Sequence, residues 1–245
     1  MSKEMEISKM KKEIVIYNMV FEVPRDCNKR CIHCLRGEKE NVHMTQRIAE
    51  EALRDVTCIT TLTFTGGEPT LNVDVIRDII HHIIRNEIYV GNFFIVLNGT
   101  NYSESLVEVL YDLYDYIREN HGDEELATLA ISDNQFQHPD YDVLEMYSKL
   151  PFYKDYKESK IKESDILNTG LAAKNNIEKR KIEVEKLHIE NSDYQIEVND
   201  GQVYVGANGD IVPCCELSYK DQEQYKLGNV LEESLSEILA RNSNL

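Results

Sequence analysis

The 245 residues of this chain can bury one full core, or one domain with a small appendage. The charged amino-terminal sequence MSKEMEISKMKKE does not resemble a signal peptide, and the apolar runs are too short to span a bilayer, so we expect a cytoplasmic protein without a membrane partner. A formal net charge of −17 argues against a nucleic-acid partner, because a sequence-independent nucleic-acid surface needs clustered Lys and Arg.

Strand-like apolar runs alternate with helical patterns in the first half of the chain, which predicts β-α units around a parallel sheet. Strands are expected at residues 14–23, 59–64, 93–97 and 127–131. The intervening helices have apolar residues spaced three and four apart, and Thr45 is expected to cap the first helix. A polar cluster follows each strand, and the carboxyl ends of parallel strands are where α/β proteins bind ligands. Four strand ends are therefore expected to converge on one site.

The pattern weakens after Pro139, where strands can be placed only near Phe152–Tyr156 and Asp165–Leu167. These two, added to the four clear strands, indicate a partial barrel of about six strands. An eight-stranded barrel usually takes about 250 residues by itself, so a full barrel does not fit.

The pattern of apolar and polar residues changes again near residue 191. Alternating residues there predict two short strands joined by a hairpin turn at Asn199–Gly201, and a last helix at 231–239 is expected to be capped by Asn229. The expected fold class is therefore α/β. It consists of a partial (β/α)6 TIM-like barrel over residues 1–190 and a small β-hairpin and helix appendage over residues 191–245.

Cys27, Cys31 and Cys34 form a C-x3-C-x2-C motif after the first expected strand. Three thiolates on one loop can hold three irons of a four-iron cluster and leave the fourth iron open, and an open position separates a reactive metal site from a structural one. Structural zinc is the alternative, but it usually takes four ligands in two short pairs, and a fourth would have to come from another part of the chain. A disulfide framework is not expected in a reducing compartment.

The turn Gly66-Gly67-Glu68-Pro69 follows the second expected strand, and its glycines allow a ligand to approach the backbone closely. Together with the cysteine motif, this turn resembles the radical S-adenosylmethionine (SAM) superfamily. The resemblance implies a six-stranded partial barrel, one [4Fe-4S] cluster on the three cysteines, and SAM bound to the open iron. It also implies reductive cleavage of SAM to methionine and a 5′-deoxyadenosyl radical, which abstracts a hydrogen from a substrate.

The same resemblance implies which residues contact SAM. The glycine turn would hold the amino group of the methionine, with Glu68 assisting, and His33 takes the position of an aromatic residue beside the adenine. Polar groups for the ribose or carboxylate would come from the ends of the third and fourth strands, namely Asn98, Ser132 and Asp133. Gln135 and His138 follow on the same loop and are expected to face the substrate.

Cationic residues flank the cysteine motif at Arg25, Lys29, Arg30 and Arg36. Such side chains can offset the charge of a thiolate-bound cluster. Solvated loop charges are the commoner outcome and are expected here.

Later segments resemble the SPASM or twitch extension of some radical SAM enzymes. Asn168–Ala172 is similar to the Gly-Arg-Ala segment that closes the barrel, with Leu171 in place of Arg, and Gly209–Cys214 is similar to part of the extension. These extensions bind auxiliary clusters through several cysteines, whereas this one offers only Cys214 and Cys215. Two thiolates are too few for an ordinary cluster, so we expect a degenerate extension with both cysteines in its core. A radical relay or a cluster shared between subunits are the alternatives.

The resemblance implies an enzyme of the type that matures peptide natural products, with a peptide or protein substrate. The electron donor would be a flavodoxin or ferredoxin. One alternative is an activase that installs a glycyl radical in a partner enzyme. Another is a non-catalytic iron–sulfur or zinc-binding interaction protein.

Overall fold

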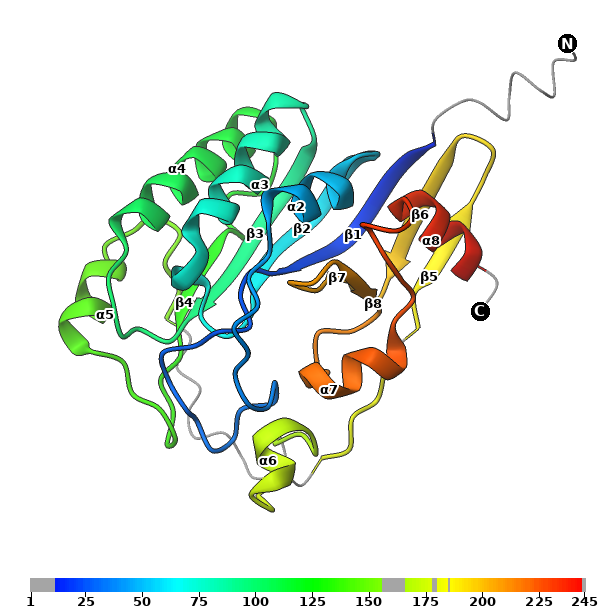
Figure 1. Cartoon of the computed structure of the whole chain (residues 1–245). Helices are drawn as coiled ribbons and strands as arrows, with labels where there is room; N and C mark the ends of the chain where they lie inside the picture. Colours follow the sequence, from blue (N-terminus) through cyan, green and yellow to red (C-terminus); the bar gives the residue numbers. More distant parts are fainter. Residues whose placement is uncertain (1–11, 156–165, 178–179, 185, 244–245) are drawn as a thin grey trace, which may run out of the picture.

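The structure, a computed structural model, describes residues 12–155, 166–177, 180–184 and 186–243, which form one mixed β-sheet with helices packed on it (Figure 1). The parallel strands are β1 (Glu13–Glu22), β2 (Val56–Thr65), β3 (Tyr89–Leu97) and β4 (Thr128–Ile131). Each of these strands pairs with the next one along the chain. The loops that follow their carboxyl ends therefore open on one edge of the sheet, as predicted.

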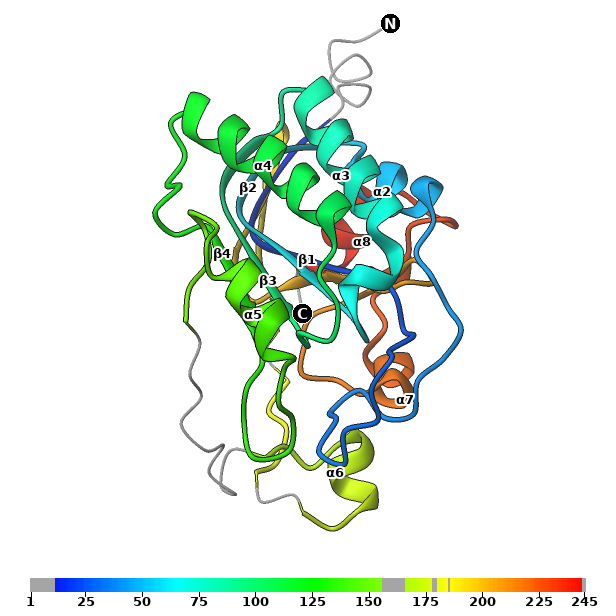
Figure 2. The same cartoon turned by 90° about the vertical axis from the view of Figure 1, so that its left-hand side faces the viewer.

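Three helices connect the parallel strands and cover one face of the sheet (Figure 2), namely α2 (Gln46–Leu53), α3 (Val73–Arg85) and α4 (Glu104–Glu119). The side chains of Thr45 and Ser103 cap α2 and α4 by accepting bonds from the N–H groups of Ile48 and Leu106, which confirms the cap expected at Thr45. The apolar faces of these helices are buried against the sheet in one continuous core.

The fifth and sixth strands of the expected barrel are reduced to isolated bridges in the described residues. Tyr153 pairs in parallel with Leu129 of β4, and Leu167 pairs in parallel with Arg180. Residues 156–165, which include one end of each expected strand, lie outside the described residues. Among the described strands the sheet does not close on itself, as a partial barrel requires.

The C-terminal segment extends the same sheet on the other side of β1. Its strands are β5 (His188–Asn191), β6 (Gln195–Asp200), β7 (Val203–Val205), β8 (Asp210–Val212) and β9 (Gly228–Asn229). Antiparallel hairpins join β5 to β6 and β7 to β8, but β6 and β7 lie end to end along β1 and run parallel to it. The hairpin predicted at Asn199–Gly201 was therefore wrong. Gly201, with a φ of +80°, bends the chain there without reversing it, because β1 offers one long free edge to both strands.

The remaining helices are short, namely α5 (Tyr141–Tyr147), α6 (Gly170–Lys174), α7 (Tyr219–Gln222) and α8 (Leu235–Asn242). The last helix begins later than predicted, at a capping box formed by Ser234 and Glu237. The predicted cap, Asn229, lies in β9, where its side chain donates to Asp210 Oδ1 at 2.8 Å. Among the described helices, none combines the length and the apolar character needed to cross a bilayer.

Candidate functional site

The loop between β1 and α2 lies at the carboxyl edge of the parallel strands (Figure 1). We call residues 23–45 the cysteine loop. It carries Cys27, Cys31 and Cys34, and all three side chains line one small cavity together with Gly67. The structure thus brings the cysteine motif and the glycine turn to the same place.

The glycine turn is packed directly on the backbone of the cysteine loop. Gly67 N donates to Pro24 O at 2.7 Å, and Glu68 N donates to Asp26 O at 3.0 Å. A Cβ atom on Gly67 would lie 2.0 Å from Asp26 O, and Gly66 has a φ of +140° with the Pro24 carbonyl beside it. Both glycines are therefore required by the contact with the loop, whether or not a ligand approaches them.

Two of the three thiols have a raised pKa. Burial is the main cause for both Cys27 and Cys31, and the proximity of Cys34 adds to it. The Cys27 sulfur accepts a hydrogen bond from Lys29 N at 3.4 Å and lies 3.9 Å from Asn98 Nδ2. Metal ligation needs thiolates, so loading of a metal on these cysteines must release protons.

The arrangement does not support the zinc alternative. Within the described residues, no three His, Cys, Asp or Glu side chains converge on the position of a single metal ion. A structural zinc site needs four ligands at about 2.0–2.3 Å from one ion. In a four-iron cluster each cysteine binds a different iron, so the thiols need only surround a common space, as these do.

Glu68 and Asn98 connect the ends of β2 and β3 to the cysteine loop. Glu68 is 2% exposed, and its carboxylate accepts from Asn98 N at 2.9 Å and from the Thr70 hydroxyl at 2.8 Å. The Asn98 side chain donates to Asn28 Oδ1 at 2.7 Å. A 3-10 helix, Pro69–Asn72, begins directly after Glu68. Both Glu68 oxygens thus bind groups of the protein, although desolvation raises the pKa of this carboxyl.

The loop after β4 makes two contacts with the cysteine loop that sequence reasoning missed. Phe136 stacks on His33 with ring centroids 4.6 Å apart, and the Cys31 thiol donates to Gln137 Oε1 at 2.9 Å. His33 Nδ1 is buried without a hydrogen-bond partner, and desolvation lowers the pKa of the ring, so the imidazole is neutral. The sequence did offer a signal for these contacts, because Phe136 and Gln137 follow shortly after the fourth predicted strand.

The other predicted residues of this loop lie at its rim. The Ser132 N–H donates to a carbonyl of β3, and Asp133 Oδ1 lies 2.7 Å from His138 Nδ1. Lys29 Nζ reaches across from the cysteine loop and donates to His138 O at 2.8 Å. The side chains of Gln135 and His138 are exposed. The strand ends that were predicted to converge therefore meet around the cysteine loop.

The α6 helix packs against the last cysteine of the motif. Leu171 N donates to Cys34 O at 2.8 Å. Gly170 has a φ of +55°, and a Cβ atom there would lie 2.3 Å from Leu35 O. The segment that was compared with a barrel-closing motif is thus placed beside the cysteine loop, and a glycine is needed at that contact.

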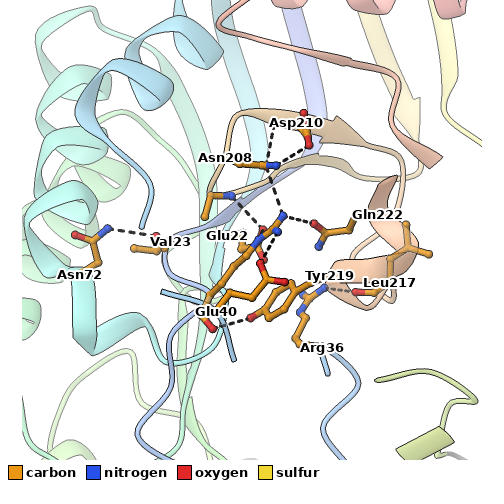
Figure 3. A network of polar contacts seen from close by, with 12 residues as sticks. Glu22, Val23, Arg36, Glu40, Asn72, Asn208, Asp210, Leu217, Tyr219 and Gln222 are labelled. Atoms are coloured by element: carbon orange, nitrogen blue, oxygen red, sulfur yellow. Dashed lines mark hydrogen bonds and ion pairs between the residues drawn. The ribbon is translucent and has the colours of Figure 1, made fainter. Parts of the chain in front are cut away.

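Two arginines that were expected as solvated loop charges are buried, so that prediction was wrong for them. Arg25 is 7% exposed and donates to Gln222 Oε1 at 2.7 Å, and Arg36 is 8% exposed and donates to Leu217 O at 2.9 Å. Figure 3 shows Arg36, Gln222 and Leu217 within this network. Arg30 is exposed as expected.

The other cysteines lie outside the cysteine loop. Cys214 is 7% exposed and packs in a small apolar cluster with Val20 and Tyr204, as expected for a core residue. Cys215 is partly buried beside it. Cys58 lies in β2 and is also partly buried.

A cavity of about 640 Å³ lies at the opposite edge of the sheet, near the amino ends of β1 and β2. Its lining includes the charged residues Glu50, Arg54 and Asp55. Ligands of parallel α/β proteins bind at the carboxyl ends of the strands, so this cavity is not the candidate site despite its size.

Two family models match the chain. One, described as the radical SAM superfamily, matches residues 21–122, and the other, the SPASM model described as an iron–sulfur cluster-binding domain, matches residues 197–244. An uncharacterised protein of Methanocaldococcus jannaschii is 28% identical over 102 residues, which cover 39% of this chain and 35% of that protein. The match thus spans about a third of the curated relative's length.

Two solved structures share the fold. The hexahistidine-tagged anSMEcpe with bound AdoMet has a TM-score of 0.56 and 12% identity, and the alignment covers 94% of this chain and 81% of that chain. The native anSMEcpe with bound AdoMet has a TM-score of 0.56 and 13% identity, with coverage of 95% and 82%. At such identities the likeness shows a common architecture, which agrees with the predicted partial barrel.

Proposed function

We propose that this chain, which matches the radical SAM and SPASM family models, is a radical SAM enzyme that binds one [4Fe-4S] cluster through Cys27, Cys31 and Cys34 and cleaves SAM reductively. The observation that carries the proposal is that the three thiols line one cavity against the glycine turn. When bound and reduced, such a cluster supplies the electron that splits SAM into methionine and a 5′-deoxyadenosyl radical.

The protein's own part begins with the hydrogen bonds to the cysteine sulfurs. Lys29 N donates to the Cys27 sulfur at 3.4 Å, and the Asn98 side-chain nitrogen lies 3.9 Å from the same sulfur. Donors to a thiolate stabilise the reduced, more negative form of an iron–sulfur cluster. We therefore assign these groups the role of adjusting how easily the site accepts an electron.

The glycine turn is proposed to hold the methionine end of SAM. Gly66 and Gly67 present backbone without side chains at the carboxyl edge, and Pro69 begins the helical turn that fixes them. Glu68 already binds Asn98 N and the following helical turn, so its contribution is to fix the site rather than to bind the ammonium group alone.

Polar and aromatic groups for the rest of SAM lie on the neighbouring loops. Asn98, Ser132 and Asp133 at the ends of β3 and β4 are proposed to bind the ribose or the carboxylate. The neutral His33 ring, held against Phe136, is proposed to stack on the adenine. Exclusion of water by these loops would protect the radical from side reactions.

We also propose a peptide or protein substrate and a flavodoxin or ferredoxin as electron donor. The support for the peptide is the SPASM segment at residues 197–244. The exposed rim at Gln135 and His138 is the surface of the site on which we expect the substrate to lie.

The test of the cluster is anaerobic reconstitution with iron and sulfide. The wild type should bind about four irons per chain and should form 5′-deoxyadenosine from SAM under dithionite. The triple Cys27→Ala/Cys31→Ala/Cys34→Ala variant should lose both, whereas the matched Cys58→Ala control should keep both. Iron retained by the triple variant at the wild-type level would contradict the proposal.

The test of the substrate class uses the same loaded enzyme. A mixed library of short peptides should accelerate the formation of 5′-deoxyadenosine and should yield products that differ in mass from the starting peptides. Acceleration by a small metabolite extract but by no peptide would refute the peptide substrate while leaving the cluster assignment intact.

A further inference from the structure

The cysteine loop is attached to the C-terminal segment on both sides of its cysteine motif. Arg25 lies two residues before Cys27, and Arg36 lies two residues after Cys34. Both side chains are buried, and both bind groups that come from the other end of the sequence. The three cysteines therefore lie between two fixed points.

The first fixed point is Arg25. Its guanidinium lies 3.3 Å from Glu22 Oε2 and 2.9 Å from Glu40 Oε2, and it donates to Gln222 Oε1 at 2.7 Å. It also lies 4.8 Å from the centroid of the Tyr219 ring. These four partners, Glu22, Glu40, Tyr219 and Gln222, lie close together in Figure 3. Two of these four partners belong to α7 in the C-terminal segment.

The second fixed point is Arg36. It donates to Leu217 O at 2.9 Å and lies 5.1 Å from the centroid of the Tyr204 ring. Tyr219 then binds the backbone at both points, because its N–H donates to Arg36 O at 3.0 Å and its hydroxyl donates to Arg25 O at 3.3 Å. One tyrosine of α7 thus spans both ends of the cysteine motif.

These contacts are energetically costly to break. A guanidinium in a buried position is unfavourable unless charged or polar groups satisfy it, and removing one partner leaves the charge uncompensated. The Glu22 side chain, which pairs with Arg25, is fully buried at the end of β1, and its Oε2 also accepts from Ala207 N at 3.0 Å. Neither arginine can therefore leave the C-terminal segment without exposing unpaired groups on both sides.

We propose that residues 204–222 act as a brace, which holds Arg25 and Arg36 and so keeps the cysteine loop in its cluster-binding geometry before any cluster is loaded. The inference rests on the proposed function for the nature of the cluster. A SPASM segment with only two cysteines thereby serves the cluster of the barrel instead of binding further clusters. Arg25 and Arg36 are positioning residues in this scheme, because they act through the loop.

The test is the reactivity of the loop thiols in the metal-free protein. Gln222→Leu removes, at nearly constant volume, the side-chain acceptor that the C-terminal segment offers to Arg25 at 2.7 Å, and Gln222→Glu keeps an acceptor there. Alkylation of Cys27, Cys31 and Cys34 by iodoacetamide, followed by peptide mass spectrometry, should be about tenfold faster in Gln222→Leu, because a lost hydrogen bond to a charged group favours local opening. Gln222→Glu should restore the wild-type rate.

A second pair of variants addresses the other fixed point. Arg36→Met should accelerate alkylation and should slow cluster uptake, with Arg36→Lys intermediate. The matched control is Arg241→Met, since Arg241 also donates to a backbone carbonyl, Leu227 O at 2.8 Å, but inside the C-terminal segment. This control should alkylate like the wild type. Far-UV circular dichroism would establish that each variant is folded.

The outcomes separate the brace from the function itself. Folded Gln222→Leu and Arg36→Met variants with wild-type alkylation rates and wild-type iron uptake would overturn the brace. A wild type that protects its thiols but takes up no cluster would refute the proposed function and leave the brace standing. If Arg241→Met accelerates alkylation as much as Arg36→Met, the effect is general loosening and the brace is refuted.

Discussion

Gly67→Ala should disrupt the cysteine loop and not only the approach of SAM. The added Cβ would lie 2.0 Å from Asp26 O, so the turn and the loop must separate by more than an ångström. Separation breaks the bonds from Gly67 N to Pro24 O and from Glu68 N to Asp26 O. Overpacking costs about 1–3 kcal/mol and each hydrogen bond about 0.5–1.5 kcal/mol, so the expected loss is about 2–6 kcal/mol, in a fold whose total stability is about 5–15 kcal/mol.

The assay compares iron uptake with global stability. The matched control is Gly91→Ala in β3, where the new Cβ would lie 2.6 Å from Thr60 O, a comparable clash with a backbone oxygen away from the cysteine loop. Both variants should unfold at lower urea concentration than the wild type. Only Gly67→Ala should also lose iron per folded chain after anaerobic reconstitution.

The refuting result is a Gly67→Ala protein that binds a full complement of iron while its affinity for SAM falls in calorimetry. The turn would then serve the ligand alone, as the motif by itself suggests. Equal iron loss in Gly91→Ala would show that reconstitution reports on general stability, and that the 2.0 Å contact at Gly67 does not control cluster binding.

Three further expectations follow from the contacts. Asn98→Leu should lower the midpoint potential of the reconstituted cluster by about 40 mV in an EPR-monitored titration without SAM, because it removes the amide nitrogen that lies 3.9 Å from the Cys27 sulfur; an unchanged potential would contradict this role. Burial raises the pKa of the Tyr204 phenol well above its ordinary value, so the folded state holds that proton more tightly than the unfolded chain does. Stability that is present below about pH 10 should therefore be lost as the pH rises further. The Tyr204 hydroxyl has no hydrogen-bond partner among the described residues, so Tyr204→Phe should reduce this alkaline loss in urea titrations at pH 8 and pH 11. Cys214→Ser/Cys215→Ser should keep about four irons per chain by colorimetric assay, and a fall from about eight to about four would show a second cluster.

The parallel half of the fold followed from periodicity, because each strand and helix there is long enough for its apolar pattern to be unambiguous. The strands β1 to β4 and the cap at Thr45 lie close to where the sequence placed them. The C-terminal strands are only two to six residues long, and alternation over such a length fits either a hairpin or two successive partners of β1. Which of the two arrangements forms depends on whether an edge of β1 is free to pair, and this is a property of the tertiary structure that a local sequence pattern does not report.

The site shows the same division between local and long-range information. The spacing of Cys27, Cys31 and Cys34 is a property of one loop and could be read directly. Arg25 and Arg36 could not be distinguished from solvated loop charges, because the groups of the C-terminal segment that cover them lie far away in sequence. Gln222 is 197 residues from Arg25, and Leu217 is 181 residues from Arg36.

A buried arginine is improbable from composition alone and becomes favourable only when a second segment supplies acceptors and rings around it. The C-terminal segment supplies both here, through Gln222, Leu217 and two tyrosines. The SPASM segment of this chain contains only two cysteines, yet it packs against the loop that carries Cys27, Cys31 and Cys34. The geometry gives a reason that does not depend on a second cluster. Without this segment, Arg36 would lose its carbonyl acceptor and Arg25 would lose Gln222 and the Tyr219 ring, and both guanidinium groups lie beside the cysteine motif.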